Sequence, residues 1–162
     1  MLFRPVYALS PVGGPPVAKL SDMLADKKAL TLSVAKRIAA AAEQEAAKNN
    51  WNIFIAIVDD GGNLMFLERM DDSQLASQEV SIAKARSALL FKRPTKALED
   101  VVSGGRIVVM SLANAVPVEG GLPLMAYGKI VGAIGISGAS SPQDGIVAKA
   151  GADELEKILS QG

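Results

Sequence analysis

The sequence predicts an α+β protein in which helices flank a mainly antiparallel sheet of about five strands. The chain has 162 residues, 49% of them hydrophobic, which suits one domain with a single core. Its periodic segments follow the order helix, two strands, two helices, two or three strands, helix. Short turns that contain glycine join consecutive strands, and such turns connect antiparallel neighbours rather than the parallel strands of a doubly wound fold.

The first 29 residues are expected to form an irregular arm, so that the domain occupies residues 30–162. The arm is rich in proline and lacks the continuous apolar core, about 7–15 residues long, of a secretory signal. No later segment reaches the roughly 18 uninterrupted apolar residues of a membrane span. We therefore expect a cytoplasmic protein that makes no contact with a membrane.

The domain is expected to begin with an amphipathic helix of about 18 residues that starts at Thr31. Asn49 and Asn50 would end this helix, because asparagine tolerates the left-handed conformation common at helix ends. Its apolar stripe recurs at three- and four-residue spacing and should face the core. The stripe consists of Leu32, Ala35, Ile38, Ala39, Ala42 and Ala46.

A β-hairpin should follow, built from residues 51–59 and 64–70. Both segments are short and rich in β-branched, aromatic or other large apolar residues. The sequence DGGN joins them, and Gly61 and Gly62 supply the positive φ angles that a tight connection needs.

Two helices should come after this hairpin. Residues 71–73 can each cap the first helix, which runs to about Phe91, and Thr95 can cap the shorter second one. Residues 106–110 are compatible with either a strand or a buried turn. The four- and three-residue spacing predicts that the long helix buries one stripe. That stripe consists of Ala76, Val80, Ala83, Ser87 and Leu90.

A second hairpin, with Gly128 and Lys129 at its turn, and a final helix should complete the domain. Alternation along residues 130–137 places small side chains on one face, which lets a helix or a ligand approach the backbone closely. The glycines that follow are spaced GxxGxxG and lie after the last strand, unlike a dinucleotide-binding motif. Ser141, Pro142 and Asp144 fit the cap, first-turn proline and capping-box acid of the final helix.

The composition excludes several kinds of chemistry. The chain has no cysteine and no histidine, so disulfides, thiolate nucleophiles, Ser-His-Asp triads and histidine metal ligands are ruled out. Seventeen basic and seventeen acidic side chains cancel, which leaves no overall field to hold nucleic acid. Any reaction would have to use carboxylates, lysine, arginine, tyrosine, hydroxyls, backbone amides or a bound cofactor.

Four ordered blocks of sequence resemble a known family. They are IAIVDDGGNLMFLERMDD, SQEVSIAKARSALLFKRPT, VPVEGGLPL and GKIVGAIGISGASSPQDGIVAKAG. Together they closely resemble the GlcG/HbpS-like family, which includes the C-terminal domain of PduO proteins, over most of the chain. The resemblance implies a profilin-like layered α/β domain that commonly assembles into tetramers, hexamers or octamers. Several members are associated with haem or corrinoid metabolism.

The resemblance also implies a set of ligand-binding residues that would meet at one rim. They are Arg69, Asp71, Arg86, Glu119, Gly120, Gly121 and Pro123, and Lys84 stands in the same block as Arg86. Each has a purely structural interpretation as well. Asp71 can cap a helix, Arg86 can pair with Glu79 on one helical face, and the glycines can turn the chain.

Three functions from different classes remain open. The first is a non-enzymatic, oligomeric binder of haem or a related tetrapyrrole. The second is a binder or sensor of a small organic acid or aldehyde, held by Arg69, Arg86 and loop amides. The third is an enzyme that uses Asp59, Asp71 or Glu119 as an acid or base. Without histidine, an axial haem ligand would be methionine, tyrosine, lysine, a hydroxyl or carboxylate oxygen, or water.

We expect the protein to form a homo-oligomer, between tetramer and octamer. Only 21% of its residues are charged, so a monomer of this size would expose more apolar surface than is usual. The family resemblance points independently to closed assemblies, which are usually symmetric. We therefore expect a small-molecule ligand bound near a subunit interface.

Overall fold

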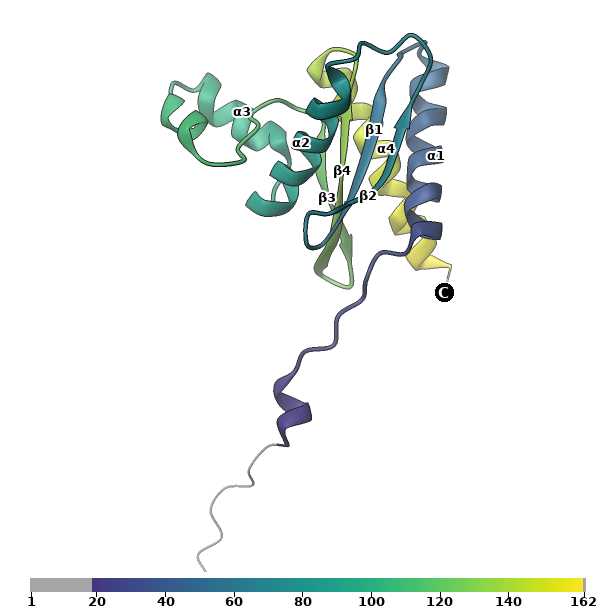
Figure 1. Ribbon diagram of the computed structural model, residues 1–162, viewed down its shortest axis with the longest axis vertical. Coiled ribbons are helices and arrows are strands. Elements are labelled where there is room, and N and C mark those ends of the chain that lie inside the picture. Colours follow the sequence, from purple (N-terminus) through teal and green to yellow (C-terminus); the bar gives the residue numbers. More distant parts are fainter. Residues whose placement is uncertain (1–18, 162) are drawn as a thin grey trace, which may run out of the picture.

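The computed structural model describes residues 19–161 (Figure 1). The larger part of the predicted N-terminal arm, residues 1–18, lies outside the described residues. The part within them contains one 3₁₀ turn, η1 (Leu20–Met23), and otherwise runs without regular structure into the first long helix.

The first helix, α1 (Leu32–Lys48), confirms the prediction made from its apolar stripe. The Thr31 hydroxyl accepts a hydrogen bond from the Val34 amide, 3.4 Å away, and so caps its first turn. Every residue of the predicted stripe is buried except Leu32, which is exposed. Because most of this buried face is alanine, α1 can approach its neighbours closely.

The sheet has four strands, one fewer than expected, and all neighbours are antiparallel. They are β1 (Phe54–Asp59), β2 (Leu64–Arg69), β3 (Gly121–Ala126) and β4 (Lys129–Ser137), in the order β2-β1-β4-β3. The difference arises at residues 107–111, which form the 3₁₀ helix η2 (Ile107–Ser111). Most of η2 is exposed, so it cannot supply the buried turn that was the other expectation.

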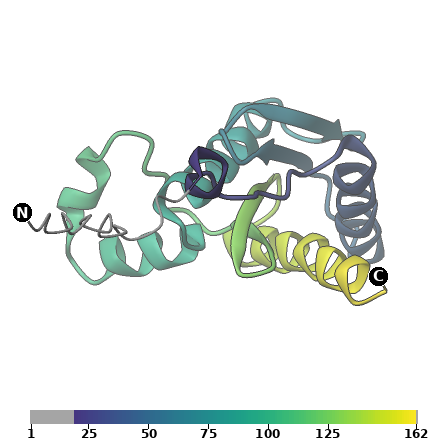
Figure 2. The same cartoon turned by 90° about the horizontal axis from the view of Figure 1, so that it is seen from below.

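Helices cover both faces of the sheet (Figures 1 and 2). Helices α1 and α4 (Ser141–Ser160) lie on one face and enclose the main core, which is centred on isoleucines of β1 and β4. Helix α2 (Ser77–Phe91) lies on the other face, over β4. The short helix α3 (Thr95–Ser103) and η2 project beyond α2. The predicted α+β class and layered arrangement are therefore confirmed.

The predicted buried stripe of α2 is wrong, apart from Ser87. Ala76, Val80 and Leu90 are exposed, and Ala83 is only half-buried. Instead, the helix buries a different set, which lies against the small side chains of β4. That set is Ser77, Ser81, Ile82, Lys84, Ala85, Ser87, Ala88 and Leu89.

Glycine in β4 explains why the small residues of α2 face inward. A Cβ atom added to Gly135 would overlap the Ser81 carbonyl oxygen and lie 2.5 Å from the Ala85 nitrogen. The helix backbone therefore rests directly on the strand, and only small side chains fit between them. This confirms the prediction of close helix packing on the small face of the strand.

A β-bulge at Val131 breaks the alternation predicted for residues 130–137. The pairing with β3 steps from Gly132 to Ile130, which leaves Val131 unpaired. Val131 consequently joins the main core, while Ile130 turns toward α2. The hairpin turn is also one residue earlier than expected, because Tyr127 and Gly128 carry its positive φ angles.

Three predicted helix caps are corrected as well. Residues 71–73 precede α2 by several positions, and the Ser73 hydroxyl instead donates to the Ile53 and Met70 carbonyls. Thr95 is the first helical residue of α3 rather than its cap. At α4 the cap is Ser140, whose amide donates to the Gln143 side chain, so Asp144 is free for another role.

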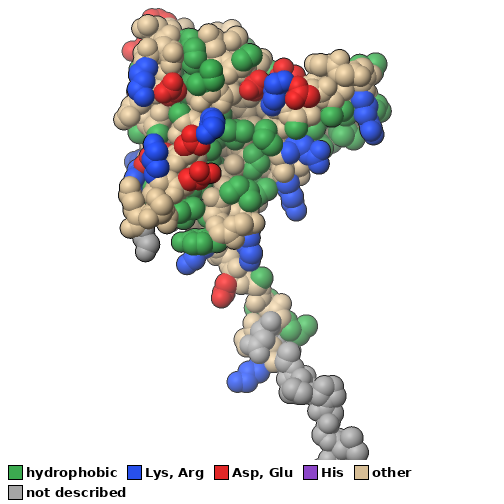
Figure 3. All heavy atoms as spheres, turned by 180° about the vertical axis from the view of Figure 1, so that it is seen from behind, with side chains coloured by type: hydrophobic (Ala, Val, Ile, Leu, Met, Phe, Trp, Pro, Cys, Tyr) green, Lys and Arg blue, Asp and Glu red, His purple; other side chains and the backbone are tan. Residues whose placement is uncertain are grey.

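The part of the chain around α3 and η2, residues 95–118, exposes an unusual amount of apolar surface. We call it the projecting lobe; part of it is visible at the protruding end of the molecule in Figure 3. Six of its large apolar side chains are exposed: Val101, Ile107, Val108, Met110, Leu112 and Val118. Among residues 19–161, no helix is both long and apolar enough to cross a membrane.

Candidate functional site

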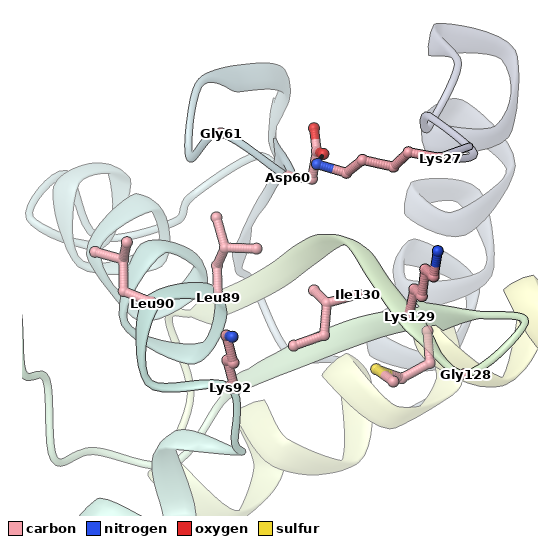
Figure 4. Close-up of a pocket in the computed structure, with 10 residues that line it drawn as sticks. Lys27, Asp60, Gly61, Leu89, Leu90, Lys92, Gly128, Lys129 and Ile130 are labelled. Carbon is pink, nitrogen blue, oxygen red and sulfur yellow. Dashed lines mark ion pairs between the residues drawn. The ribbon is translucent and has the colours of Figure 1, made fainter. Parts of the chain in front are cut away.

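A cavity of about 580 Å³ opens where the end of α2 meets the turns of both hairpins (Figure 4). We call it the hairpin cavity. It is lined by Lys27, Asp60, Gly61, Leu89, Leu90, Lys92, Met125, Gly128, Lys129 and Ile130. The lining comes from α2, β3, β4, the β1–β2 turn and the N-terminal segment, so only the folded chain assembles it.

The floor of the hairpin cavity is apolar. Leu89 packs with Ile130 and neighbouring small residues of the sheet in a minor core cluster. Met125 pairs with Ile130 across the β3–β4 ladder, so both side chains stand on the sheet face that α2 covers. The Val131 bulge determines this arrangement, because it turns Ile130 rather than Val131 toward the cavity.

Lysines surround this floor. Lys27 forms an ion pair with Asp60, and the Lys129 ammonium donates to the Asp26 carbonyl oxygen at 3.2 Å. These two contacts hold the N-terminal segment beside the cavity. Lys92 follows α2 in the left-handed conformation, with φ of 53°, and extends from the helix end. The cavity therefore combines an apolar floor with three cations and one carboxylate, which suits an apolar molecule that carries negative groups.

A second cleft, of about 450 Å³, holds three of the predicted site residues, and we call it the loop cleft. Glu119, Gly120 and Gly121 line it from one side, and Lys96, Lys149 and acidic residues of α4 line the other. Burial raises the pKa of the Glu119 carboxyl, although the charge of nearby Lys96 opposes this rise.

Asp59, the other carboxylate considered as an acid or base, lies outside the loop cleft. Burial acts to raise the pKa of Asp59, but hydrogen bonds from Asn63 and the turn amides together outweigh burial, so the pKa is lowered.

Behind the loop cleft lies a fully buried ion pair. The Lys84 ammonium is 2.7 Å from the Asp144 carboxylate, and both side chains are at most 3% exposed. Asp144 also accepts a hydrogen bond from the Ala139 amide at 3.1 Å. Burial raises the pKa of Asp144, and the hydrogen bond and charge of Lys84 oppose this. The pair joins α2 to α4 and leaves no room for a side chain at Gly120.

The remaining predicted site residues lie apart from the loop cleft. The Arg69 guanidinium sits over the Phe54 ring, 5.8 Å from its centre, at the β2 edge of the sheet, and Asp71 is exposed in the turn that follows. The Arg86 side chain donates to the Gly62 carbonyl oxygen at 3.0 Å rather than pairing with Glu79. Pro123 pairs with Ala133 inside the sheet.

The structure therefore does not bring the predicted residues to one rim. Arg86 lines a separate cavity of about 140 Å³, and the loop glycines lie at the β3 edge of the sheet, opposite Arg69. A small acid held jointly by Arg69, Arg86 and the loop amides has no geometric support. Within residues 19–161, no group of three or more acidic side chains is placed to hold a metal ion.

The residues of the hairpin cavity were missed because they share no local pattern. They are single lysines and apolar residues on five separate segments, and only the pairing of the strands brings them together. The sequence gives a clearer indication of the buried position of Lys84. This lysine lies on the same face of the helix as Ser77, Ser81 and Ala88, and a lysine among such small residues indicates a buried charge that needs a partner.

Comparisons with known proteins identify close relatives. Residues 30–153 match the family model described as haem degrading protein HbpS-like. The chain is 44% identical over 111 residues to protein GlcG of Escherichia coli, a match that covers 68% of this chain and 83% of GlcG.

Solved structures of similar proteins share the fold. The crystal structure of a complex of PduOC with haem is 30% identical, with a TM-score of 0.72, and the match covers 78% of this chain and 95% of that one. A double mutant of Streptomyces reticuli HbpS is also 30% identical, with a TM-score of 0.75, over 87% of this chain and 97% of that one.

Proposed function

The chain belongs to the haem degrading protein HbpS-like family, and from this premise we propose that it binds haem or a related tetrapyrrole in the hairpin cavity. The observation that carries the proposal is the combination of an apolar floor with three lysines in a space of about 580 Å³. A tetrapyrrole of this class has a flat apolar ring, which needs an apolar surface, and carboxylate side chains, which need cations.

The residues of the hairpin cavity fit such a molecule. Leu89 and Ile130 offer apolar surface to a ring, which gains affinity by leaving water. Lys92 and Lys129 lie around that surface, where their ammonium groups can bind carboxylates through charge-assisted hydrogen bonds. Bound haem would supply a redox-active iron at this position. The haem complex of the related PduOC supports the assignment of ligand class.

Replacing both Lys92 and Lys129 by glutamate is expected to weaken haem binding about 100-fold, since losing each charge contact costs about tenfold, or 1.4 kcal/mol. The measurement is a titration of the full-length protein with haem, followed by the Soret absorbance. The double variant Lys96→Glu/Lys149→Glu reverses the same amount of charge in the loop cleft and should bind haem as the unchanged protein does.

If the loop-cleft variant alone weakened haem binding, the result would indicate that haem binds in the loop cleft instead of the hairpin cavity. Absence of any Soret change in the unchanged protein would contradict haem binding altogether. In that case, metal-free protoporphyrin and a corrinoid would test the wider tetrapyrrole class by the quenching of Trp51 fluorescence.

The protein is also proposed to assemble with further copies of itself through the projecting lobe. The six large exposed apolar side chains of this lobe lie within residues 101–118. Such a patch is typical of a surface that is buried against another protein. No enzymatic step is part of this proposal.

Light scattering at low micromolar concentration should give a mass at least twice the 16.8 kDa chain. The double variant Val108→Glu/Met110→Glu should reduce that mass, because it places two charges inside the apolar patch. Leu75→Glu, at a residue that is 71% exposed but outside the lobe, serves as the control and should leave the mass unchanged. A monomeric unchanged protein would contradict the proposal.

A further inference from the structure

We infer that the Met125 thioether is a ligand of the iron when haem occupies the hairpin cavity. This inference rests on the proposed function and adds to it the identity of the iron ligand. It starts from the absence of histidine and cysteine in the sequence, which leaves the choice of ligand to the remaining side chains of the cavity.

The other lining residues offer no comparable donor. Leucine, isoleucine and glycine side chains cannot coordinate a metal, and a lysine must first lose its ammonium proton before its nitrogen has a lone pair to donate. Asp60 holds a carboxylate in the cavity, but that carboxylate is paired with Lys27. Met125 is the remaining side chain of the cavity that can donate to iron. Its neutral sulfur is a soft donor that haem iron accepts in other proteins.

The position of Met125 supports this role. It lies beside Ile130 on the strand pair that forms the floor, so its thioether is among the groups that a ring bound on the floor would meet. Met125 is 44% exposed, unlike its neighbour Leu124, which is completely buried in the main core. An exposed methionine near the end of a strand contributes little to the core, and its flexible side chain is free to adjust to a ligand.

The test compares iron protoporphyrin with metal-free protoporphyrin in the unchanged protein and in Met125→Leu. A leucine keeps the apolar volume but removes the sulfur. We expect Met125→Leu to lower the affinity for haem about tenfold, equivalent to 1.4 kcal/mol. It should also abolish the weak far-red charge-transfer band of thioether-ligated ferric haem. The affinity for metal-free protoporphyrin should stay the same. Met65→Leu, at a half-buried methionine of β2 that lies outside both the cavity lining and the projecting lobe, should change neither affinity.

A gain of function provides a second measurement. Met125→His should bind haem more tightly than the unchanged protein and show a nitrogen-ligated spectrum, whereas Met65→His should not. An unaltered haem spectrum in Met125→Leu would overturn the inference, and so would an equal loss of affinity for both porphyrins, since that indicates packing alone. Either result leaves the proposed function intact. If neither porphyrin binds the unchanged protein, the assignment of haem to the hairpin cavity fails and the inference fails with it.

Discussion

Replacing Lys84 by methionine is expected to lower the free energy of unfolding by about 3–5 kcal/mol, because it leaves the Asp144 carboxylate buried without a charged partner. Small domains have a total stability of about 5–15 kcal/mol, so this loss would be a large fraction of it. The measurement is equilibrium unfolding in urea at neutral pH, with the midpoint and slope fitted for each variant.

Two further variants separate the buried charge from other effects. Lys84→Met combined with Asp144→Leu should recover much of the lost stability, since an apolar pair of similar volume can replace a buried ion pair. Lys96→Met removes a lysine from an exposed pair with Asp100 and should have little measurable effect. If Lys84→Met were as stable as Lys96→Met, the proposed structural role of the buried pair would be wrong.

Replacing Gly135 by alanine is expected to cost about 3 kcal/mol or more, because the added methyl group has no room under α2. Its Cβ would overlap the Ser81 carbonyl oxygen, which belongs to the helix backbone and cannot rotate away. The whole helix would have to lift from β4, and Val58 and Ala85 would lose contacts in the minor core cluster on that face. Thermal unfolding followed by circular dichroism would measure this loss.

The matched control is Gly104→Ala. Gly104 has an ordinary negative φ of −73°, and its Cβ would lie 3.2 Å from the nearest atom, the Asp100 carbonyl oxygen, so a small shift accommodates it. Equal stability losses in the two variants would show that loss of glycine flexibility, rather than contact with α2, determines the cost.

The sequence predicted the strands and helices of this fold well, because their signals are local. The stripe of α1 and the two hairpins each depend on a few adjacent residues, and the structure confirms that they form. The details of the turns differ from the prediction, because Gly62 has a positive φ but Gly61 does not, and the second turn lies at Tyr127 and Gly128. The face of α2 was predicted incorrectly for a physical reason: periodicity selects the most apolar stripe, whereas Gly135 and Ala133 select the smallest one. That choice depends on a strand about 50 residues further along the chain, and a helical pattern carries no information about it.

The candidate site was harder to predict than the fold. The family blocks drew attention to Glu119, Gly120 and Gly121, which the structure places in one cleft. They gave no indication of Lys92 or Met125, because a cavity between turns depends on how the strands pair and where the helix ends. The Val131 bulge illustrates the difficulty, since one extra residue decides whether Ile130 or Val131 faces the cavity.

The construction of the hairpin cavity has a consequence for how this protein can diverge. Its walls are two turns and a helix end, and their backbone shapes depend on Gly62, Gly128 and the left-handed Lys92 rather than on most of the side chains that line the space. Exposed side chains outside such special positions can usually be exchanged for about 0.5 kcal/mol or less. Lys27, Lys129 and Met125 can therefore change in descendants while the scaffold persists. Under the proposed function, single substitutions at these positions would therefore change which ligand is preferred at little cost in stability.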